Sequence, residues 1–196
     1  MGGYMARKSR VTFQLDAGDI QELSQDDIVM ILRGADMMIA SGGRNLLAKL
    51  LKGSKDKKIL ELHLNECPAY GYYHDKTLKE ITHCIDYCIK KDYLSIRYNG
   101  RLPMLVFAPK GWEIEKHTYA LEWYDILDVM SNNDSIDMEQ IKQLLNVNRE
   151  VVLLILDMIK NKHNTKLIPL LLCWKEIEVK KVRKEINNVI SSLQDN

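Results

Sequence analysis

The sequence has no long apolar run and almost no net charge. No window reaches the roughly 18 consecutive apolar residues that a membrane-spanning helix needs, and the charged first ten residues have no apolar stretch behind them to form a secretory signal. The 28 Lys and Arg residues nearly balance the 27 Asp and Glu residues, leaving a formal net charge of +1. We therefore expect a cytoplasmic protein with no membrane partner, and a charged partner must be sought in local charge patterns.

Cysteine is also scarce, with four residues in 196. Without an export signal we expect reduced thiols rather than disulfides. His63, Cys67, Cys84 and Cys88 form pairs at helical spacing, which is one pattern for a zinc site, but structural zinc usually has tighter C-x-x-C spacing, so core thiols are favoured. No pattern of nucleophile, base and carboxylate marks an active site. We expect no metal, no cofactor and no catalytic residue.

The remaining composition is that of a globular protein, with 46% hydrophobic and 28% charged residues. The polar segment SNNDS, residues 131–135, separates two helical patterns and is the best boundary candidate. We predict an N-terminal extension over residues 1–24, a first domain over 25–131 and a helical C-terminal unit over 132–196. The extension is weakly patterned, with VTFQLD (residues 11–16) as a candidate strand.

Helix start and stop signals divide the first domain. Ser24, followed by two aspartates, predicts the start of a helix that ends at the Ser-Gly-Gly of residues 41–43. A second helix runs from Arg44 to the stop at Gly53, and Ser54 is predicted to cap a third helix, KDKKILELHL. A capping box, T-x-x-E at residues 77–80, begins a fourth helix that runs to about residue 91. Its predicted buried face comprises Leu78, Ile81, Cys84, Ile85, Cys88 and Ile89.

A β-hairpin follows in the run YLSIRYNGRLPMLVF, because Asn99-Gly100 tolerates both positive φ angles of a type I′ turn. That turn would place Leu94 opposite Leu105, Ile96 opposite Pro103 and Tyr98 opposite Arg101, with Arg97 and Leu102 on the other face. A long helix is predicted from about residue 112 to 130. This order predicts a mainly α fold with a small β-hairpin wing, a winged helix-turn-helix followed by a C-terminal helical unit.

Beyond residue 135 the pattern is helical throughout. Asn148 caps REVVLLILDMIK, which is apolar nearly all round and must be buried by its neighbours or by a partner. The last helix carries four cations outside an apolar stripe formed by Val182, Ile186, Val189, Ile190 and Leu193. Residues 166–189 are similar to a HEAT-type helix pair, although a solenoid needs several such repeats. We expect these helices to dock a helicase or other protein partner, or a second copy in a homodimer.

The charge concentrates in residues 44–58, where six cations face one carboxylate, a balance of +5. A glycine bend, a serine and the start of a helix are features that hold phosphates, and lysines beside them displace counterions. The alternative is a solvated helix face. The cations are Arg44, Lys49, Lys52, Lys55, Lys57 and Lys58.

Four blocks, LKGSKDKKILEL (residues 51–62), Tyr70-Gly71, KDYL and RLPMLVFAPKG, resemble in order and spacing the RQC domain, the winged helix of RecQ-family DNA helicases. The resemblance covers about residues 25–120. It implies that the loop at residues 52–58 contacts duplex phosphates and that the hairpin lies where strands separate, with Tyr98 as the aromatic wedge. The departures are Lys52 for an arginine, Asp56 for a serine, Leu102 for a tyrosine and Ala108 for a threonine.

The helicase motor itself is missing from the sequence, which has no G-x-x-x-x-G-K-[ST] phosphate loop. We therefore expect a stand-alone, non-enzymatic module. For Tyr98 the alternative to a wedge is a cross-strand cation–π pair with Arg101. The predicted DNA-binding residues are Arg44, Lys49, Lys52, Ser54, Lys55, Lys57, Lys58, Lys79, Arg97, Tyr98 and Arg101.

These observations and the resemblance predict a protein that binds the phosphates of double-stranded or forked DNA in replication, recombination or repair. The outward side of the fourth helix carries Glu80 and Asp86 beside its lysines, so we expect little readout of base edges. The alternatives are a protein interaction or oligomerisation module and an accessory subunit of a separate helicase.

Overall fold

The computed structural model describes residues 14–133 and 135–195, which form two compact units that divide between Glu115 and Lys116. The division falls inside one long helix, α5 (Pro109–Ser131), whereas the sequence suggests a boundary after residue 131. Residues 11–13 of the predicted N-terminal strand lie outside the described residues, and residues 14–16 are not in a strand. No helix in the described ranges combines the length and the apolar character that crossing a membrane requires.

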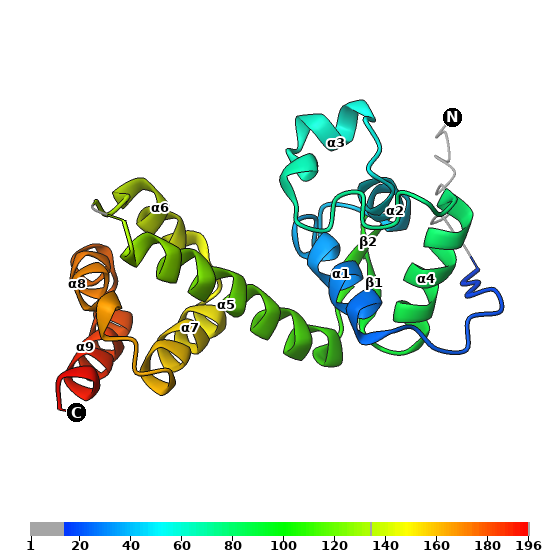
Figure 1. Ribbon diagram of the computed structural model, residues 1–196. Coiled ribbons are helices and arrows are strands. Elements are labelled where there is room, and N and C mark those ends of the chain that lie inside the picture. The colour runs from blue at the N-terminus through cyan, green and yellow to red at the C-terminus, as the bar shows by residue number, and fades with distance from the viewer. Residues whose placement is uncertain (1–13, 134, 196) are drawn as a thin grey trace, which may run out of the picture. The chain divides into compact units, whose positions relative to one another are not determined.

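The first unit is a winged helix-turn-helix, as predicted (Figure 1). Its elements are α1 (Gln25–Asp36), α2 (Arg44–Lys52), α3 (Lys57–Glu61), the 3-10 turn η1 (Leu64–Glu66), α4 (Leu78–Lys90), β1 (Leu94–Asn99) and β2 (Leu102–Phe107), followed by the start of α5. The capping signals predict two starts correctly. Ser24 and Asp27 form a capping box on α1, and Thr77 and Glu80 form one on α4.

The start of α3 differs from the prediction. Asp56, not Ser54, is its N-cap, with an Asp56 carboxylate oxygen accepting from the Lys58 amide at 3.0 Å. Ser54 lies before the helix start: its amide closes the end of α2 by donating to the Lys49 carbonyl at 2.9 Å after Gly53 turns the chain at φ 77°, and its hydroxyl accepts from the Asp56 amide at 3.2 Å. The third helix begins two residues later and ends three residues earlier than predicted, so it is five residues long instead of ten.

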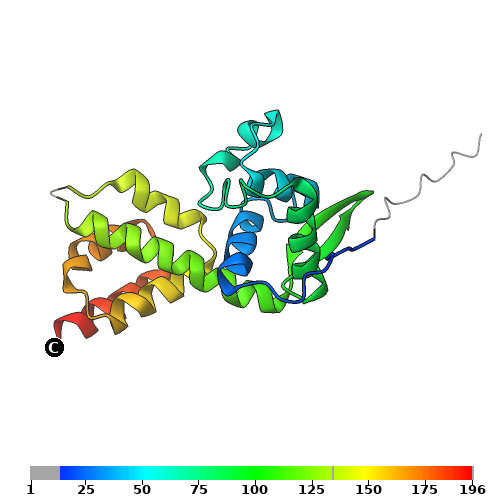
Figure 2. The same ribbon diagram turned by 45° about the vertical axis from the view of Figure 1, so that its right-hand side comes forward.

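The core of the first unit lies between α1, α2, α4 and the hairpin. Ile31, Leu47, Ile85, Leu94 and Leu105 are all fully buried there, and each such side chain contributes about 1.5–3 kcal/mol to folding. Figure 2 shows α1 and α4 with the hairpin beside them. This core fixes the position of the wing relative to α2.

The buried face of α4 lacks one residue that was predicted to be buried and includes two that were not. Leu78, expected in the core, is 46% exposed because it is the first residue of the helix, beyond the core's edge. Asp86 and Tyr87, expected on the outward side, are buried. Asp86 tolerates burial because a guanidinium faces it, as described below.

The hairpin forms, but its register is shifted by two residues. Leu94 lies opposite Phe107, Ile96 opposite Leu105 and Tyr98 opposite Pro103. The predicted type I′ turn is wrong because positive φ occurs at Gly100 and not at Asn99, which places Gly at the first central position, the pattern of a type II′ turn. A shift of two keeps every side chain on its predicted face.

The second unit is helical. After the end of α5 it contains α6 (Met138–Gln143), η2 (Leu144–Asn146), α7 (Arg149–Asn161), η3 (Thr165–Leu167), α8 (Ile168–Ile177) and α9 (Lys180–Gln194). Asn148 caps α7, accepting from the Glu150 amide at 2.9 Å. The predicted apolar stripe of α9 is buried at all five positions, and α7 buries five residues of its own against its neighbours, chiefly α9.

Candidate nucleic-acid interface

The side chain of Arg44 forms an ion pair inside the first unit. Its Nη1 atom lies 2.5 and 2.6 Å from the two carboxylate oxygens of Asp86 on α4, and the Asp86 side chain is 2% exposed. A buried carboxylate needs a hydrogen-bonded cation to remain ionised at low cost. The charge of Arg44 therefore serves the fold, and it is not free to neutralise a phosphate.

Lys49 and Lys52 are also engaged inside the unit. Lys49 Nζ lies 2.7 Å from Asp56 Oδ2, and this hydrogen bond, followed by that of the Lys58 amide, holds the pKa of Asp56 below its usual value. Lys52 Nζ donates to the backbone carbonyls of His74 at 2.6 Å and Lys76 at 2.7 Å. Both lysines thereby fasten α2 to the segments that follow it.

The other three cations of the basic segment point into solvent. Lys55, Lys57 and Lys58 are exposed, and within the described residues no ion pair is recorded for Lys55 or Lys58. Lys57 Nζ lies 3.4 Å from Glu61, with side chains 87% and 58% exposed, and such a surface pair holds its partners weakly. These three ammonium groups, which we call the α3 cations, are available to an anionic ligand.

Tyr70 and Gly71 hold the loop that carries the α3 cations. The Tyr70 hydroxyl lies 2.9 Å from the Gly53 carbonyl oxygen and 3.1 Å from that of Ser54. The Gly71 amide donates to the Leu50 carbonyl at 3.1 Å, and a Cβ on Gly53 would lie 3.0 Å from the Gly71 Cα. The Tyr-Gly block of the sequence therefore sets the backbone of residues 53–54.

A groove of about 420 Å³ separates the basic segment from the wing. Its lining includes the polar residues Arg44, Asn45, Lys49, Asp56 and Lys58 and the apolar residues Leu46, Ile96, Pro103 and Leu105. The wing is docked there by backbone bonds, from Ala40 to the Leu105 carbonyl at 2.9 Å and from Leu105 to the Gly42 carbonyl at 2.8 Å. The structure thus brings the basic segment and the hairpin together on one side of the unit.

The hairpin tip differs from the expected one. Gly100 and Arg101 form the turn, and Tyr98 lies two residues back, half-buried opposite Pro103. The predicted placement of Tyr98 directly opposite Arg101 is therefore wrong, because Tyr98 pairs with Pro103. Leu102, which is 60% exposed, lies beside the turn instead. The sequence did not single out Leu102, because the place of Leu102 beside the turn depends on the register of the hairpin.

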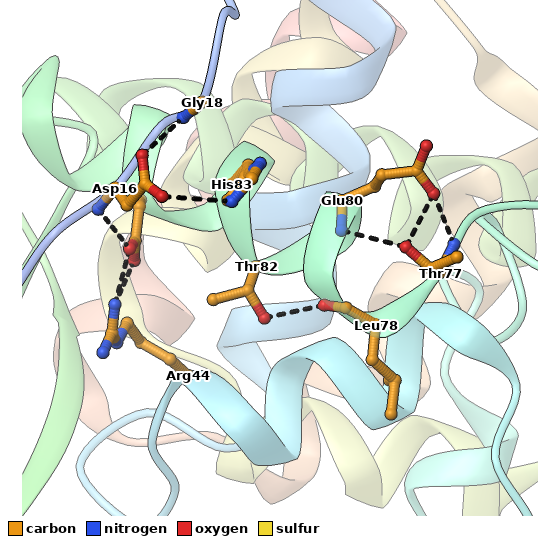
Figure 3. Close-up of polar contacts among 9 residues, drawn as sticks. Asp16, Gly18, Arg44, Thr77, Leu78, Glu80, Thr82 and His83 are labelled. Atoms are coloured by element: carbon orange, nitrogen blue, oxygen red, sulfur yellow. Dashed lines mark hydrogen bonds and ion pairs between the residues drawn. The ribbon is translucent and has the colours of Figure 1, made fainter.

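A segment before α1 lies across the outward side of α4 (Figure 3). The Asp16 amide donates to Asp86 Oδ2 at 2.8 Å, and Asp16 Oδ2 lies 3.3 Å from His83 Nε2. The Gly18 amide, donating to Asp16 Oδ1 at 2.9 Å, is the main cause of the lowered pKa of Asp16. Lys79 is exposed beside this segment. The local Asp-x-Gly turn was readable from the sequence, but its contact with α4 was not.

In the described ranges, no group of three or more His, Cys, Asp or Glu side chains could hold a metal ion. Cys67, Cys84 and Cys88 are buried and His63 is exposed. Burial raises the pKa of the Cys88 thiol to about 12 and also raises that of Cys84. Both thiols therefore stay protonated at neutral pH and are poor nucleophiles.

Comparison with known proteins assigns the family of the first unit. The RQC domain family matches residues 19–124, more than half of the chain and every helix and strand of the winged helix. The chain belongs to the RQC domain family. The RQC match also contains the basic segment, the groove and the hairpin.

One curated relative is ATP-dependent DNA helicase RecQ from Bacillus subtilis (strain 168), which is 31% identical over 74 residues. The match covers 38% of this chain and 12% of the helicase, so the chain spans a small part of that relative's length. No solved structure matches the chain.

Proposed function

We propose that this RQC chain is a DNA-binding module that holds the phosphates of a duplex through the α3 cations and the wing. The observation that carries the proposal is the exposure of Lys55, Lys57 and Lys58, of which Lys58 lines the groove together with Ile96 and Pro103 of the hairpin. The printed name of the Bacillus relative, a DNA helicase, supports DNA as the polymer.

The binding would be electrostatic and indifferent to base sequence. Each duplex phosphate neutralised by a lysine or arginine releases condensed counterions and adds about 0.9 to the slope of log affinity against log salt. Arg97 and Arg101 on the wing are exposed and would add to the α3 cations. The surface of α4, where a base-reading helix would contact DNA, is partly covered by residues 14–18 and carries Glu80.

The wing would give the module a preference for forks, junctions or ends. Arg101 at the turn and the exposed Leu102 beside it form the outermost part of the hairpin. An apolar side chain next to a cation can pack on an exposed terminal base pair while the cation contacts a phosphate. Tyr98, half-buried beside Pro103, would support the ribbon from one face rather than form its leading point.

On this proposal the chain performs no chemistry by itself. It serves replication, recombination or repair in the cytoplasm, alone or beside a separate ATPase that supplies strand separation. Its residues would position DNA, because the described site offers lysines, arginines and apolar contacts and no group suited to acid–base or nucleophilic work.

A titration of forked, blunt duplex and single-stranded DNA at several salt concentrations tests the proposal. We expect the fork to bind most tightly, and the variant Lys55→Glu/Lys57→Glu/Lys58→Glu to lower the salt slope by about 2–3. The matched control is Lys142→Glu/Arg149→Glu/Lys160→Glu, which reverses three exposed cations of the second unit. Binding without a salt slope, or equal slopes for wild type and the α3 variant, would exclude the proposal.

A protein-docking function is the alternative, and one observation favours it. On α5, Leu121 is 47% exposed and Val129 is 65% exposed, two helical turns apart. The predicted docking helix, α7, is less suited than expected because its own unit buries most of its apolar face. Light scattering over a dilution series distinguishes a dimer, which would dissociate, from a monomer of constant mass.

A further inference from the structure

The first half of α9 carries a concentrated positive charge that the winged helix does not use. Lys180, Lys181, Arg183 and Lys184 fall within five residues and are all exposed. Together with Asn187 they line a shallow hollow of about 530 Å³ on the surface of the second unit. We call these four cations the α9 patch.

Within the described residues, the acidic side chains near the α9 patch form their recorded contacts with neutral donors and none with its cations. Glu178 is buried and accepts from the Trp174 indole at 2.9 Å and from the Val179 amide at 3.1 Å. Glu185 accepts from the Asn188 side chain at 3.1 Å. In the part of the chain that the structure describes, no ion pair or hydrogen bond is recorded for the side chains of Lys180, Lys181 or Lys184, while Arg183 donates to the Glu178 carbonyl.

The placement of these charges opposes the stability of α9. Lys180 and Lys184 are four residues apart on one face, where like charges repel, and the first turn contains cations instead of the acidic residues that the helix dipole favours. The rest of the exposed face is mainly neutral, with Asn187, Asn188, Ser191 and Gln194. A face that only keeps the protein soluble would not need its cations gathered at one end.

The charge of the second unit as a whole does not explain the α9 patch. Residues 116–196 contain eleven Lys and Arg against twelve Asp and Glu, a balance of −1. The cations are therefore segregated within a unit that is otherwise acidic. Segregated cations create a local positive potential that attracts a polyanion.

We propose that the α9 patch is a second binding site for the phosphate backbone of duplex DNA. This inference rests on the proposed function, since the ligand would be the same duplex that the α3 cations hold. A polyanion with evenly spaced charges suits three exposed lysines in two helical turns, with the open hollow between them. Both sites belong to one chain, so a duplex long enough to span them would meet the second site at a raised effective concentration.

The test compares salt slopes for three proteins on a duplex of about 40 base pairs: the full chain, Lys180→Glu/Lys181→Glu/Lys184→Glu, and Lys142→Glu/Arg149→Glu/Lys160→Glu. The two variants have the same net charge, and circular dichroism verifies that each remains folded. We expect the α9 variant to lower the slope by about 2–3 and the control to leave it nearly unchanged. Equal slopes for the two variants would overturn the inference.

A second measurement separates this inference from the proposed function. If the α3 variant loses its salt slope and the α9 variant keeps it, the α9 site is excluded and the proposed function stands. If the α3 variant binds like wild type, the proposed function fails. Vesicles of anionic phospholipid provide the other arm: lysine-dependent binding to vesicles, without an effect on the duplex, would overturn the assignment to DNA.

Discussion

The basic segment contains two groups of cations that look alike in the sequence and differ in the structure. On α2, Arg44, Lys49 and Lys52 each contact a carboxylate or backbone carbonyls of their own unit. At the start of α3, Lys55, Lys57 and Lys58 extend into solvent. A net charge counted along a chain therefore overestimates the charge available to a ligand, because folding uses part of it.

Among these cations, Arg44 should cause the largest loss of stability when it is replaced. Arg44→Ala leaves the carboxylate of Asp86 buried without its cation, which should lower the free energy of unfolding by about 3–5 kcal/mol. Chemical denaturation measures the loss, and Arg97→Ala on the exposed wing is the control. Recovery of stability in Arg44→Ala/Asp86→Ala is expected, since that change removes the unpaired charge. If Arg44→Ala were as stable as Arg97→Ala, the difference between the two groups would disappear.

A smaller effect is expected at Lys52. Lys52→Met removes two charge-assisted hydrogen bonds to backbone carbonyls and should cost about 1.5–3 kcal/mol. The same change at Lys55 should alter stability by no more than about 0.5 kcal/mol, while weakening DNA binding and lowering the salt slope by about 0.9. Denaturation and DNA titration of both variants together check the contrast. A loss of stability in Lys55→Met would contradict the difference between the two groups of cations. Weaker DNA binding in Lys52→Met with unchanged stability would contradict it as well.

The smallest effect concerns pH and the Lys49–Asp56 pair. Because the pKa of Asp56 is lower in the folded protein than in the unfolded chain, its contribution to stability is complete above its unfolded pKa of about 4. It is lost as the pH falls through the folded pKa. Asp56→Asn should lose less stability between pH 5 and pH 2.5 than wild type, as measured by thermal unfolding. Asp75→Asn is the control, because it makes the same substitution at an exposed position for which the described residues show no ion pair.

The features that sequence reasoning predicted correctly are local. Ser24 and Thr77 begin helices because their side chains bond to amides three residues away, and Gly53 ends α2 because it adopts a positive φ. The stripe of α9 follows from helical periodicity alone. Each of these signals lies within a few residues of the element that it specifies.

The features that were missed depend on contacts between distant residues. Nothing near Arg44 in the sequence indicates that it faces Asp86, 42 residues away, or that Asp16 lies on the same carboxylate from 70 residues away. The hairpin turn was misplaced because Asn99-Gly100 and Gly100-Arg101 can both form a two-residue turn. The structure has the turn at Gly100-Arg101, and in the register that it sets the Leu105 amide bonds to the Gly42 carbonyl. Availability of a cation, like strand register, is a property of the folded unit.

The docking of β2 also limits how the wing can associate with other chains. An antiparallel ribbon normally offers an outer row of amides and carbonyls on which a foreign strand can grow. Here Pro103 has no amide to offer, and the amide and carbonyl of Leu105 are already bonded to Gly42 and Ala40. The outer edge of β2 is therefore a poor template for an added strand, and crowded molecules cannot use this edge for fibril-like stacking.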